Sequence, residues 1–390
     1  MPQTGSINKD AADPNKFVKG LEGIIAAQTA LSLVDGEASK LYYRGISVSE
    51  FIENSSCYEE VIFLLWNNRF PAAAELAEFK KKLAAKRAVP AEAMTLLKTL
   101  PKKTHPMAVL RTMVSAMAAF DPDSEKIDLE STCRQSLFLT AVFPTLIAAF
   151  MRIREGKDPV APDLSLSHAA NFLYMMHGQK PEKEMERGLD AYLILLADHS
   201  LNASTFSARV TASTQADTYS AITSAIGTLK GDLHGSANQR AMEMILEIGS
   251  PEKAQDYVRN ILSQKKKVMG FGHRIYKKED PRATAFRKIA EDLCKRAGNM
   301  KWIEISNRVE KVMWEEKQIP CNVDFFSASV LYVLGFPVDF FTTVFAASRV
   351  GGWTAHLMEQ RADNRLIRPG AEYTGPRDQH YVPMDKRKSG

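Results

Sequence analysis

Long apolar runs alternate with short polar clusters along most of this chain. Four runs are rich in apolar residues and bounded by Pro, Gly or polar clusters, namely 58–69, 106–120, 135–156 and 181–200. They are longer than an ordinary strand, and bounded apolar segments of this length are typical of helices. The sequence therefore predicts a mainly helical protein of the all-α class.

One short segment near the N-terminus has a β pattern instead. In ALSLVDGEASKLYYRG (30–45), apolar residues lie on both sides of an Asp-Gly pair. Such a pair between apolar segments is typical of a hairpin turn. We therefore expect two short strands joined by a tight turn.

The segment 135–153 is apolar on more than one face. Helices of this kind are surrounded by other helices or buried in a subunit interface. We therefore expect this chain to form an oligomer.

Composition excludes several classes of protein. At 390 residues, the chain is long enough for two domains, or for one large domain carrying a smaller one. A net charge of +5 is too small to indicate nucleic-acid binding. The first 16 residues lack the features of a secretory or transit peptide, and we expect no later stretch to be apolar enough to span a bilayer. We expect a cytoplasmic protein that binds neither nucleic acid nor membrane.

The cysteines and most histidines have an ordinary structural interpretation. The four cysteines lack the spacing of a zinc site and are interpreted as reduced thiols: Cys57, Cys133, Cys294 and Cys321. Five of the eight histidines are interpreted as hydrogen-bonded structural residues: His105, His168, His177, His356 and His380.

Two histidines adjoin glycines, in GDLHGSAN (His234) and GFGH (His273). Glycine beside a histidine lets the backbone and a ligand approach closely, although glycines that cap helices would leave the same pattern. Neither segment matches a dinucleotide fingerprint or a phosphate-binding loop. The spacing also predicts no metal site.

Asp324 and three arginines have unusual neighbours. Asp324 lies among apolar and aromatic residues where a helix is expected to start, so it is either a helix cap or a desolvated base. Arg282, Arg349 and Arg368 are set among apolar residues or glycines. Bidentate recognition of carboxylates would explain all three arginines, whereas a surface salt bridge would explain any one of them.

Five blocks of the sequence resemble the citrate synthase family. They are ADHSLNASTF (197–206), GDLHGSAN (231–238), VMGFGHRIYKKEDPR (268–282), PCNVDFFSASVLYVLGFP (320–337) and FFTTVFAASRVGGWTAHLMEQ (340–360). The Gly-Phe-Gly-His…Asp-Pro-Arg block is the family signature. The resemblance implies an all-α fold and a homodimer as the smallest active unit. It also implies a large helical domain (1–226 and 335–390) and a smaller helical domain (227–334) that closes over the active site.

The resemblance also implies roles for individual residues. Asp324 corresponds to the base that removes a proton from the methyl group of acetyl-CoA, and His234 to the donor to the thioester oxygen. His273 corresponds to the donor to the ketone oxygen of oxaloacetate. The residues that correspond to carboxylate ligands are His199, Arg282, Arg349 and Arg368, with Arg368 supplied by the partner subunit.

Coenzyme A is expected as a co-substrate and product, and no cofactor is expected to stay bound. The resemblance places its binding loop at Val268, Met269, Gly270, Phe271, Gly272 and His273. Arg274 or the lysines at 265–267 would meet its phosphates, although a lysine run is also typical of a solvated face.

The loop around His234 departs from the family pattern. Asp232, Ser236 and Gln239 replace the usual proline, glycine and glutamate. A 2-methylcitrate synthase acting on propionyl-CoA uses the same catalytic residues, and one methylene is worth only about 1–3 kcal/mol in an acyl pocket. That enzyme, and a catalytically silent helical scaffold, therefore remain alternatives to citrate synthase.

Overall fold

A computed structural model describes residues 17–276 and 278–387. Thr29–Leu366 forms one compact unit, and the residues before and after it are grouped as a second unit. In the described part of the second unit, the regular structure is two short 3-10 helices, Lys19–Leu21 and Met384–Lys386. The prediction about residues 1–16 lies outside the described residues.

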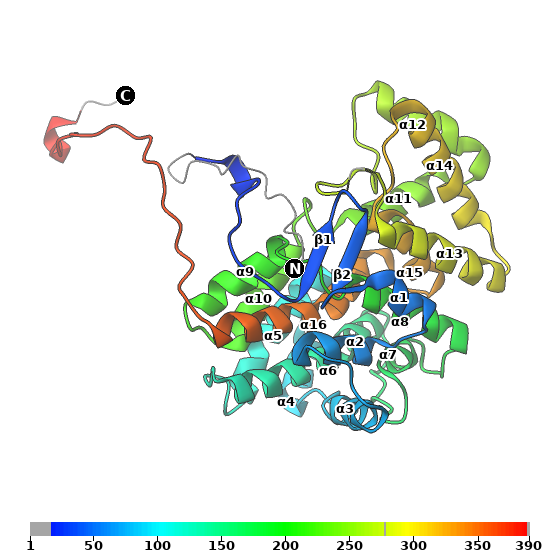
Figure 1. Cartoon of the computed structure of the whole chain (residues 1–390), viewed down its shortest axis with the longest axis horizontal. Helices are drawn as coiled ribbons and strands as arrows, with labels where there is room; N and C mark the ends of the chain where they lie inside the picture. The colour runs from blue at the N-terminus through cyan, green and yellow to red at the C-terminus, as the bar shows by residue number, and fades with distance from the viewer. Residues whose placement is uncertain (1–16, 277, 388–390) are drawn as a thin grey trace, which may run out of the picture. The chain divides into compact units, whose positions relative to one another are not determined.

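The larger unit is built almost entirely from helices (Figure 1). The first eight are α1 (Val48–Glu53), α2 (Tyr58–Asn67), α3 (Ala73–Ala85), α4 (Ala91–Thr99), α5 (Pro106–Met117), α6 (Leu129–Arg154), α7 (His168–His177) and α8 (Lys183–Leu196). The next eight are α9 (Ala203–Ser213), α10 (Thr218–Leu229), α11 (Ala237–Ile248), α12 (Ala254–Ser263), α13 (Pro281–Arg296), α14 (Lys301–Lys317), α15 (Val323–Val333) and α16 (Phe341–Ala362). Three 3-10 helices are η2 (Ala118–Phe120), η3 (Pro251–Lys253) and η4 (Val338–Phe340). The predicted all-α class is confirmed.

The N-terminal hairpin differs from its prediction at the turn. Strands β1 (Ser32–Asp35) and β2 (Lys40–Tyr43) are antiparallel, with Ser32 opposite Tyr43 and Asp35 opposite Lys40. A short third strand, β3 (Ile46–Ser47), pairs with β2. Four residues separate Asp35 from Lys40, so the expected tight turn is wrong. The Asp35 carboxylate accepts backbone N–H groups from the first part of this loop, which stabilises the longer connection.

Helix α6 runs through the core. It begins at a cap in which Asp128 Oδ1 accepts the Ser131 N–H, and it continues through Pro144 to Arg154. Its length and apolar composition suffice to cross a membrane, so the sequence-based statement that no stretch is apolar enough was wrong. Most of its apolar window is nevertheless buried inside the protein, which explains why it is apolar on several faces.

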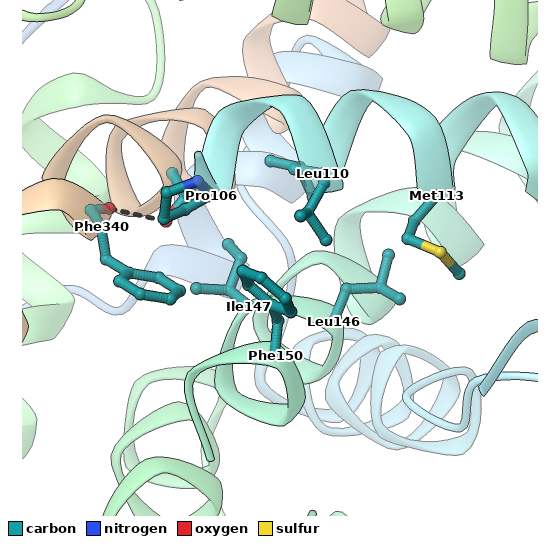
Figure 2. A pocket seen from close by; sticks show the side chains of 9 residues that line it. Pro106, Leu110, Met113, Leu146, Ile147, Phe150 and Phe340 are labelled. Carbon is teal, nitrogen blue, oxygen red and sulfur yellow. Dashed lines mark hydrogen bonds between the residues drawn. The ribbon is translucent and has the colours of Figure 1, made fainter. Parts of the chain in front are cut away.

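The packing between α5, α6 and η4 is nearly complete. Figure 2 shows Leu110 and Met113 of α5 facing Leu146 and Phe150 of α6, with Phe340 at one end. The apolar cavity between them holds only about 10 Å³. This volume is too small for a substrate, so the region belongs to the core.

Helices α11 to α15 pack mainly on one another within the larger unit. Helix α13 packs on α14 and α15, α12 on α14, and α11 on α15. In Figure 1, α12 and α14 lie side by side at the upper right. The boundaries predicted for a small domain, 227–334, stay a prediction.

Candidate active site

The loop that carries His273 needs its two glycines. Gly270 and Gly272 have φ angles of 81° and 78°, in the left-handed region that favours glycine. A Cβ atom on Gly270 would lie 2.8 Å from the Phe325 Cβ of α15. The loop is paired with the chain before α15, because Gly272 N–H donates to Pro320 O and Asn322 N–H to Gly270 O, each at 2.9 Å. These glycines therefore hold the loop against α15 and are not helix caps.

Hydrogen bonds assign the tautomer of His273. Its Nδ1 accepts the N–H groups of Ile275 and Tyr276, at 3.0 and 3.1 Å. A ring nitrogen that accepts from backbone N–H carries no proton. The neutral ring of His273 therefore carries its proton on Nε2, which makes this atom a hydrogen-bond donor.

Three rings come together beside this loop. The ring centroids of His199 and His273 are 5.5 Å apart, and Tyr276 lies 5.9 Å from His199 and 4.6 Å from His273. Burial, followed by the charges of Arg282 and Arg349, lowers the pKa of His199 well below its usual value. His199 is therefore neutral, and its buried Nε2 has no hydrogen-bond partner among the described residues.

The N-terminal hairpin packs against the same loop. A Cβ atom on Gly36 would lie 2.5 Å from the carbonyl oxygen of Ile275. The turn between β1 and β2 thus approaches the backbone two residues after His273, and only glycine permits this approach.

His234 is oriented from α9. The Ser204 N–H lies 3.3 Å from His234 Nε2, and the Ser204 hydroxyl lies 2.9 Å from the same atom. The indole N–H of Trp353 donates to that hydroxyl at 3.1 Å. Burial, followed by the charge of Arg349, lowers the pKa of His234 to about 4. The ring is therefore neutral at physiological pH, with Nε2 as acceptor and the proton on Nδ1.

Asp324 is in the first turn of α15, but it is not the cap of this helix. The Asn322 side chain accepts the Asp324 N–H at 3.0 Å, so Asn322 is the cap. The Asp324 carboxyl is left for another role. Burial raises its pKa to about 7, against the opposing charges of Arg282 and Arg349. A carboxyl group with this pKa can accept and release a proton near neutral pH.

Arg282 forms a buried ion pair with Asp280. Its Nε lies 3.0 Å from Asp280 Oδ1 and its Nη2 lies 2.9 Å from Oδ2, and both side chains are almost fully buried. Burial alone would lower the pKa of Arg282, but Asp280 raises it overall. Asp280 Oδ2 also accepts the Val323 N–H at 3.1 Å. The same carboxylate therefore links Arg282 to the start of α15.

Arg349 is buried in the middle of α16. Its Nε donates to Leu196 O at 2.7 Å, and its guanidinium lies 4.9 Å from the ring centroid of Phe345. Burial lowers the pKa of Arg349 to about 10, so the group remains charged at neutral pH. The charges of Arg282 and Arg349 both act on His199 and Asp324. The structure thus brings the predicted histidines, aspartate and two arginines together.

Two predicted residues are not brought into this cluster. Arg368 is exposed and belongs to the second unit, whose position relative to the site is not determined. Arg274 is exposed on the loop after His273, whereas Val268 and Gly270 of the same loop are buried.

An open pocket lies beside the His273 loop. It has a volume of about 390 Å³ and is lined by α13, α14 and residues 319–321, which adjoin Gly272. Lys278, Arg287 and Lys311 contribute positive charge and Trp314 an exposed ring, while Glu279 and Glu310 oppose the cations.

The three substituted positions around His234 have separate roles. Asp232 is exposed and lies 3.7 Å from Arg240, also exposed. The hydroxyl of buried Ser236 donates to Lys230 O at 3.2 Å. Gln239 donates to Glu243 on the surface of α11. Gly235, which follows His234, is still required, because a Cβ atom there would lie 2.3 Å from Leu229 O.

Residues that support the cluster were not identified from the sequence. Ser204 and Trp353 orient His234, Asn322 caps the helix of Asp324, and Asp280 holds Arg282. Tyr276 packs against both histidine rings. They belong to the resembling blocks, but single polar or aromatic residues carry no local signal of such roles.

Within 17–276 and 278–387, no group of three or more His, Cys, Asp or Glu side chains is arranged to hold a metal ion.

Known proteins resemble this chain over nearly its whole length. The family described as "Citrate synthase, C-terminal domain" matches residues 20–370. The chain is 45% identical to citrate synthase of Haloferax volcanii, over 95% of this chain and 98% of that protein. It is 44% identical to 2-methylcitrate synthase 2 of Corynebacterium glutamicum, over 95% of this chain and 97% of that protein.

A solved structure extends the comparison to three dimensions. The ternary complex of citrate synthase from Thermoplasma acidophilum with carboxymethyl coenzyme A and oxaloacetate has a TM-score of 0.90 to this structure and 34% sequence identity. The similarity covers 95% of this chain and all of that one. The fold, the clustered histidines and aspartate, and near-complete coverage by relatives lead to one conclusion: this chain belongs to the citrate synthase family.

Proposed function

We propose that this protein is a citrate synthase, which condenses acetyl-CoA with oxaloacetate and water to give citrate and CoA. The observation that carries the proposal is the set of protonation states of Asp324, His234 and His273. Burial raises the pKa of Asp324 to about 7, while His234 and His273 are neutral rings with assigned N–H donors. Enolisation requires a base and a hydrogen-bond donor to the thioester oxygen, and the carbonyl addition that follows requires a second donor to the ketone oxygen.

Enolisation uses Asp324 and His234. The Asp324 carboxylate takes a proton from the methyl carbon of acetyl-CoA, and the C–H electron pair moves toward the thioester oxygen. The His234 Nδ1–H donates to that oxygen as its charge grows. One well-placed donor of this kind typically contributes roughly 3–4 kcal/mol to transition-state stabilisation. A neutral histidine suits this step, because its proton stays available for donation at physiological pH.

Carbon–carbon bond formation uses His273. The enol carbon attacks the ketone carbon of oxaloacetate, and the electrons of the C=O bond move to its oxygen. The His273 Nε2–H polarises this oxygen and donates to the alkoxide as it forms, and the proton that Asp324 took from the methyl group balances the protonation of the alkoxide. Water then hydrolyses the citryl thioester, giving a carboxylate and the thiol of CoA.

The substrate carboxylates would be held by His199, Arg282 and Arg349. Both arginines are buried and charged, and planar guanidinium groups bind carboxylates in a defined orientation. Fixing the ketone in this way supplies the entropic part of the rate acceleration.

CoA would bind along 268–272, with its phosphates near the positive side chains of the adjoining pocket. Lys311→Ala should raise the KM for acetyl-CoA without changing the KM for oxaloacetate. An unchanged KM for acetyl-CoA would remove the pocket from this assignment.

2-Methylcitrate synthase is the second candidate, favoured by the 44% identity to the Corynebacterium glutamicum enzyme. It would use the same residues with propionyl-CoA. The test is CoA release by the purified protein from acetyl-CoA or propionyl-CoA, with and without oxaloacetate. Citrate synthase predicts a higher kcat/KM for acetyl-CoA and release only with oxaloacetate. A preference for propionyl-CoA would support the second candidate, and no release from either would contradict both and favour a silent scaffold.

We also propose a cytoplasmic homodimer in which Arg368 completes the site of the partner subunit. Arg368→Ala and Asp324→Ala should each be nearly inactive. A mixed dimer of the two variants has one site with both defects and one with neither, so activity should return toward half of the wild-type value. Absence of recovery in demonstrably mixed dimers would contradict a role for Arg368 across the interface.

A further inference from the structure

A buried carboxylate that the proposed reaction does not use precedes His199. The Asp198 side chain is fully buried, and its Oδ2 accepts hydrogen bonds from the Ser32 hydroxyl, the Ser200 N–H at 3.3 Å and His356 Nε2 at 3.3 Å. Burial raises the pKa of Asp198, but His356 and Arg349 lower it by more, so the carboxylate is charged.

The network continues through α16 and α9. Arg209 donates from Nη1 to His356 Nδ1 at 3.2 Å and to Glu359 at 2.6 Å. Arginine can only donate, so His356 Nδ1 accepts and the proton on Nε2 faces Asp198. Glu359 in turn accepts the Ala30 N–H at 2.8 Å. The chain of contacts therefore joins α16 and the start of the N-terminal hairpin to Asp198.

This network holds the turn on which His199 lies. The Asp198 N–H lies 3.2 Å from the Tyr43 hydroxyl, and Ser200 N–H donates to the Ser32 hydroxyl at 2.8 Å. Ser200 has a φ of 51°, a conformation that non-glycine residues adopt only when neighbours enforce it. Two strands and α16 thus fix the backbone on both sides of His199.

Helix α16 packs tightly against the turn that carries His199. A Cβ atom on Gly352 would lie 2.2 Å from Ala197 O and 2.8 Å from Asp198 Oδ1. His199, between these fixed residues, has a buried Nε2 without a hydrogen-bond partner among the described residues, and its ring lies against His273. A rigid turn with one unpaired polar atom is the arrangement expected of a preorganised ligand contact.

We propose that Asp198, held by His356 and Ser32, is a positioning residue that sets His199 for the dicarboxylate substrate. The identity of the substrate rests on the proposed function, whereas the positioning of His199 by Asp198 does not. A buried carboxylate costs several kcal/mol unless it is fully hydrogen-bonded, and Asp198 Oδ1 has no hydrogen-bond partner among the described residues. Stability alone would therefore be served equally well by an apolar residue. The charge serves here to gather three donors around one turn.

The first experiment is a double-mutant cycle between Asp198 and His199, with the KM for oxaloacetate as the measured quantity. In Asp198→Asn, the amide oxygen can still accept the three hydrogen bonds but lacks the charge that strengthens them, and we expect the KM for oxaloacetate to rise about ten-fold, with a smaller change in kcat at saturation. The control Asp121→Asn weakens a comparable carboxylate contact with Tyr219 and should leave this KM unchanged. If Asp198 acts through His199, then Asp198→Asn adds nothing to the effect of His199→Ala. Additive effects would overturn the proposal.

A second set of variants covers the case in which Asp198→Asn does not fold. His356→Phe removes the donor to Asp198, whereas His356→Gln can keep it. We expect the KM for oxaloacetate to rise in the first variant and to recover largely in the second. Equal KM values for the two variants would contradict the role of His356 as a donor.

A crystal structure of the Asp198→Asn variant, or of His356→Phe if the former does not fold, tests the positioning itself. The proposal predicts that the His199 ring leaves its contact with His273, now at a centroid distance of 5.5 Å. An unmoved ring would overturn the proposal. This readout stands even if wild-type protein shows no turnover, a result that would contradict the proposed function instead.

Discussion

The raised pKa of Asp324 makes a prediction about stability that needs no substrate. Its pKa is about 7 in the folded protein, against an ordinary value of 3.8, chiefly because the carboxyl is buried. Between these two pH values, the folded state keeps a proton that the unfolded state has lost. Raising the pH through this window therefore destabilises the wild-type protein. Asp324→Asn, which cannot ionise, escapes this loss.

The magnitude follows from the two pKa values. The full difference corresponds to roughly 4 kcal/mol of unfolding free energy above pH 7. The residue as a whole is only half-buried, so solvent screening reduces the expected difference to about 2 kcal/mol. Asp324→Asn should gain this much relative to wild type as the pH rises from about 4 to 7, with no further gain at higher pH.

The assay is denaturant unfolding of both proteins at fixed protein concentration, at several pH values from 4.5 to 8.5. Asp232→Asn is the matched control, since its side chain is largely exposed in the His234 loop. A difference between Asp324→Asn and wild type that does not change with pH would refute the reasoning about burial.

Three further substitutions test the geometry of the site. Ser204→Ala removes the hydroxyl beside His234 Nε2, so we expect kcat to fall about ten-fold with little change in the KM for oxaloacetate; an unchanged kcat in steady-state assays would contradict that orientation role. Gly270→Ala places a Cβ against α15 at a positive φ, and thermal unfolding should show a loss of roughly 1–3 kcal/mol, whereas a neutral result would mean that the loop relaxes. Asp280→Asn leaves the buried charge of Arg282 poorly compensated, and should cost about 3–5 kcal/mol in unfolding free energy; wild-type stability would refute the importance of the pair.

The sequence predicts helices where the apolar runs are long and clearly bounded. The runs at 58–69 and 106–120 correspond to α2 and α5, where Pro106 opens α5 after the His105 cap. The length of the hairpin turn is not predicted correctly, because an Asp-Gly pair is typical of a two-residue turn. In the structure, Gly36 is needed for its close contact with Ile275. That contact is between segments about 240 residues apart, so no local pattern could reveal it.

The site could be predicted only as far as residue types and blocks allow. The resemblance named His234, His273 and Asp324, but local reasoning left Asp324 as a helix cap or a base. The structure decides between these because Asn322, two residues earlier, makes the capping hydrogen bond. Partners such as Ser204 and Trp353 are joined to His234 only by the fold.

For His356, the sequence-based interpretation agrees with the structure but is incomplete. This residue was interpreted from the sequence as a structural histidine, and its buried hydrogen bonds agree with that interpretation. The sequence could not show that its partner, Asp198, adjoins a predicted substrate ligand in a rigid turn, because this depends on how α8, α9 and α16 pack.

The central claim is that Asp324 is the base of an acyl-CoA condensation, and one paired measurement tests it most directly. Oxaloacetate affinity and the rate of CoA release from acetyl-CoA should be measured for wild type and for Asp324→Asn. The account predicts unchanged oxaloacetate affinity and a rate that falls by several orders of magnitude, because the variant keeps the shape of the site but cannot accept the methyl proton. Near-normal turnover in Asp324→Asn would contradict it.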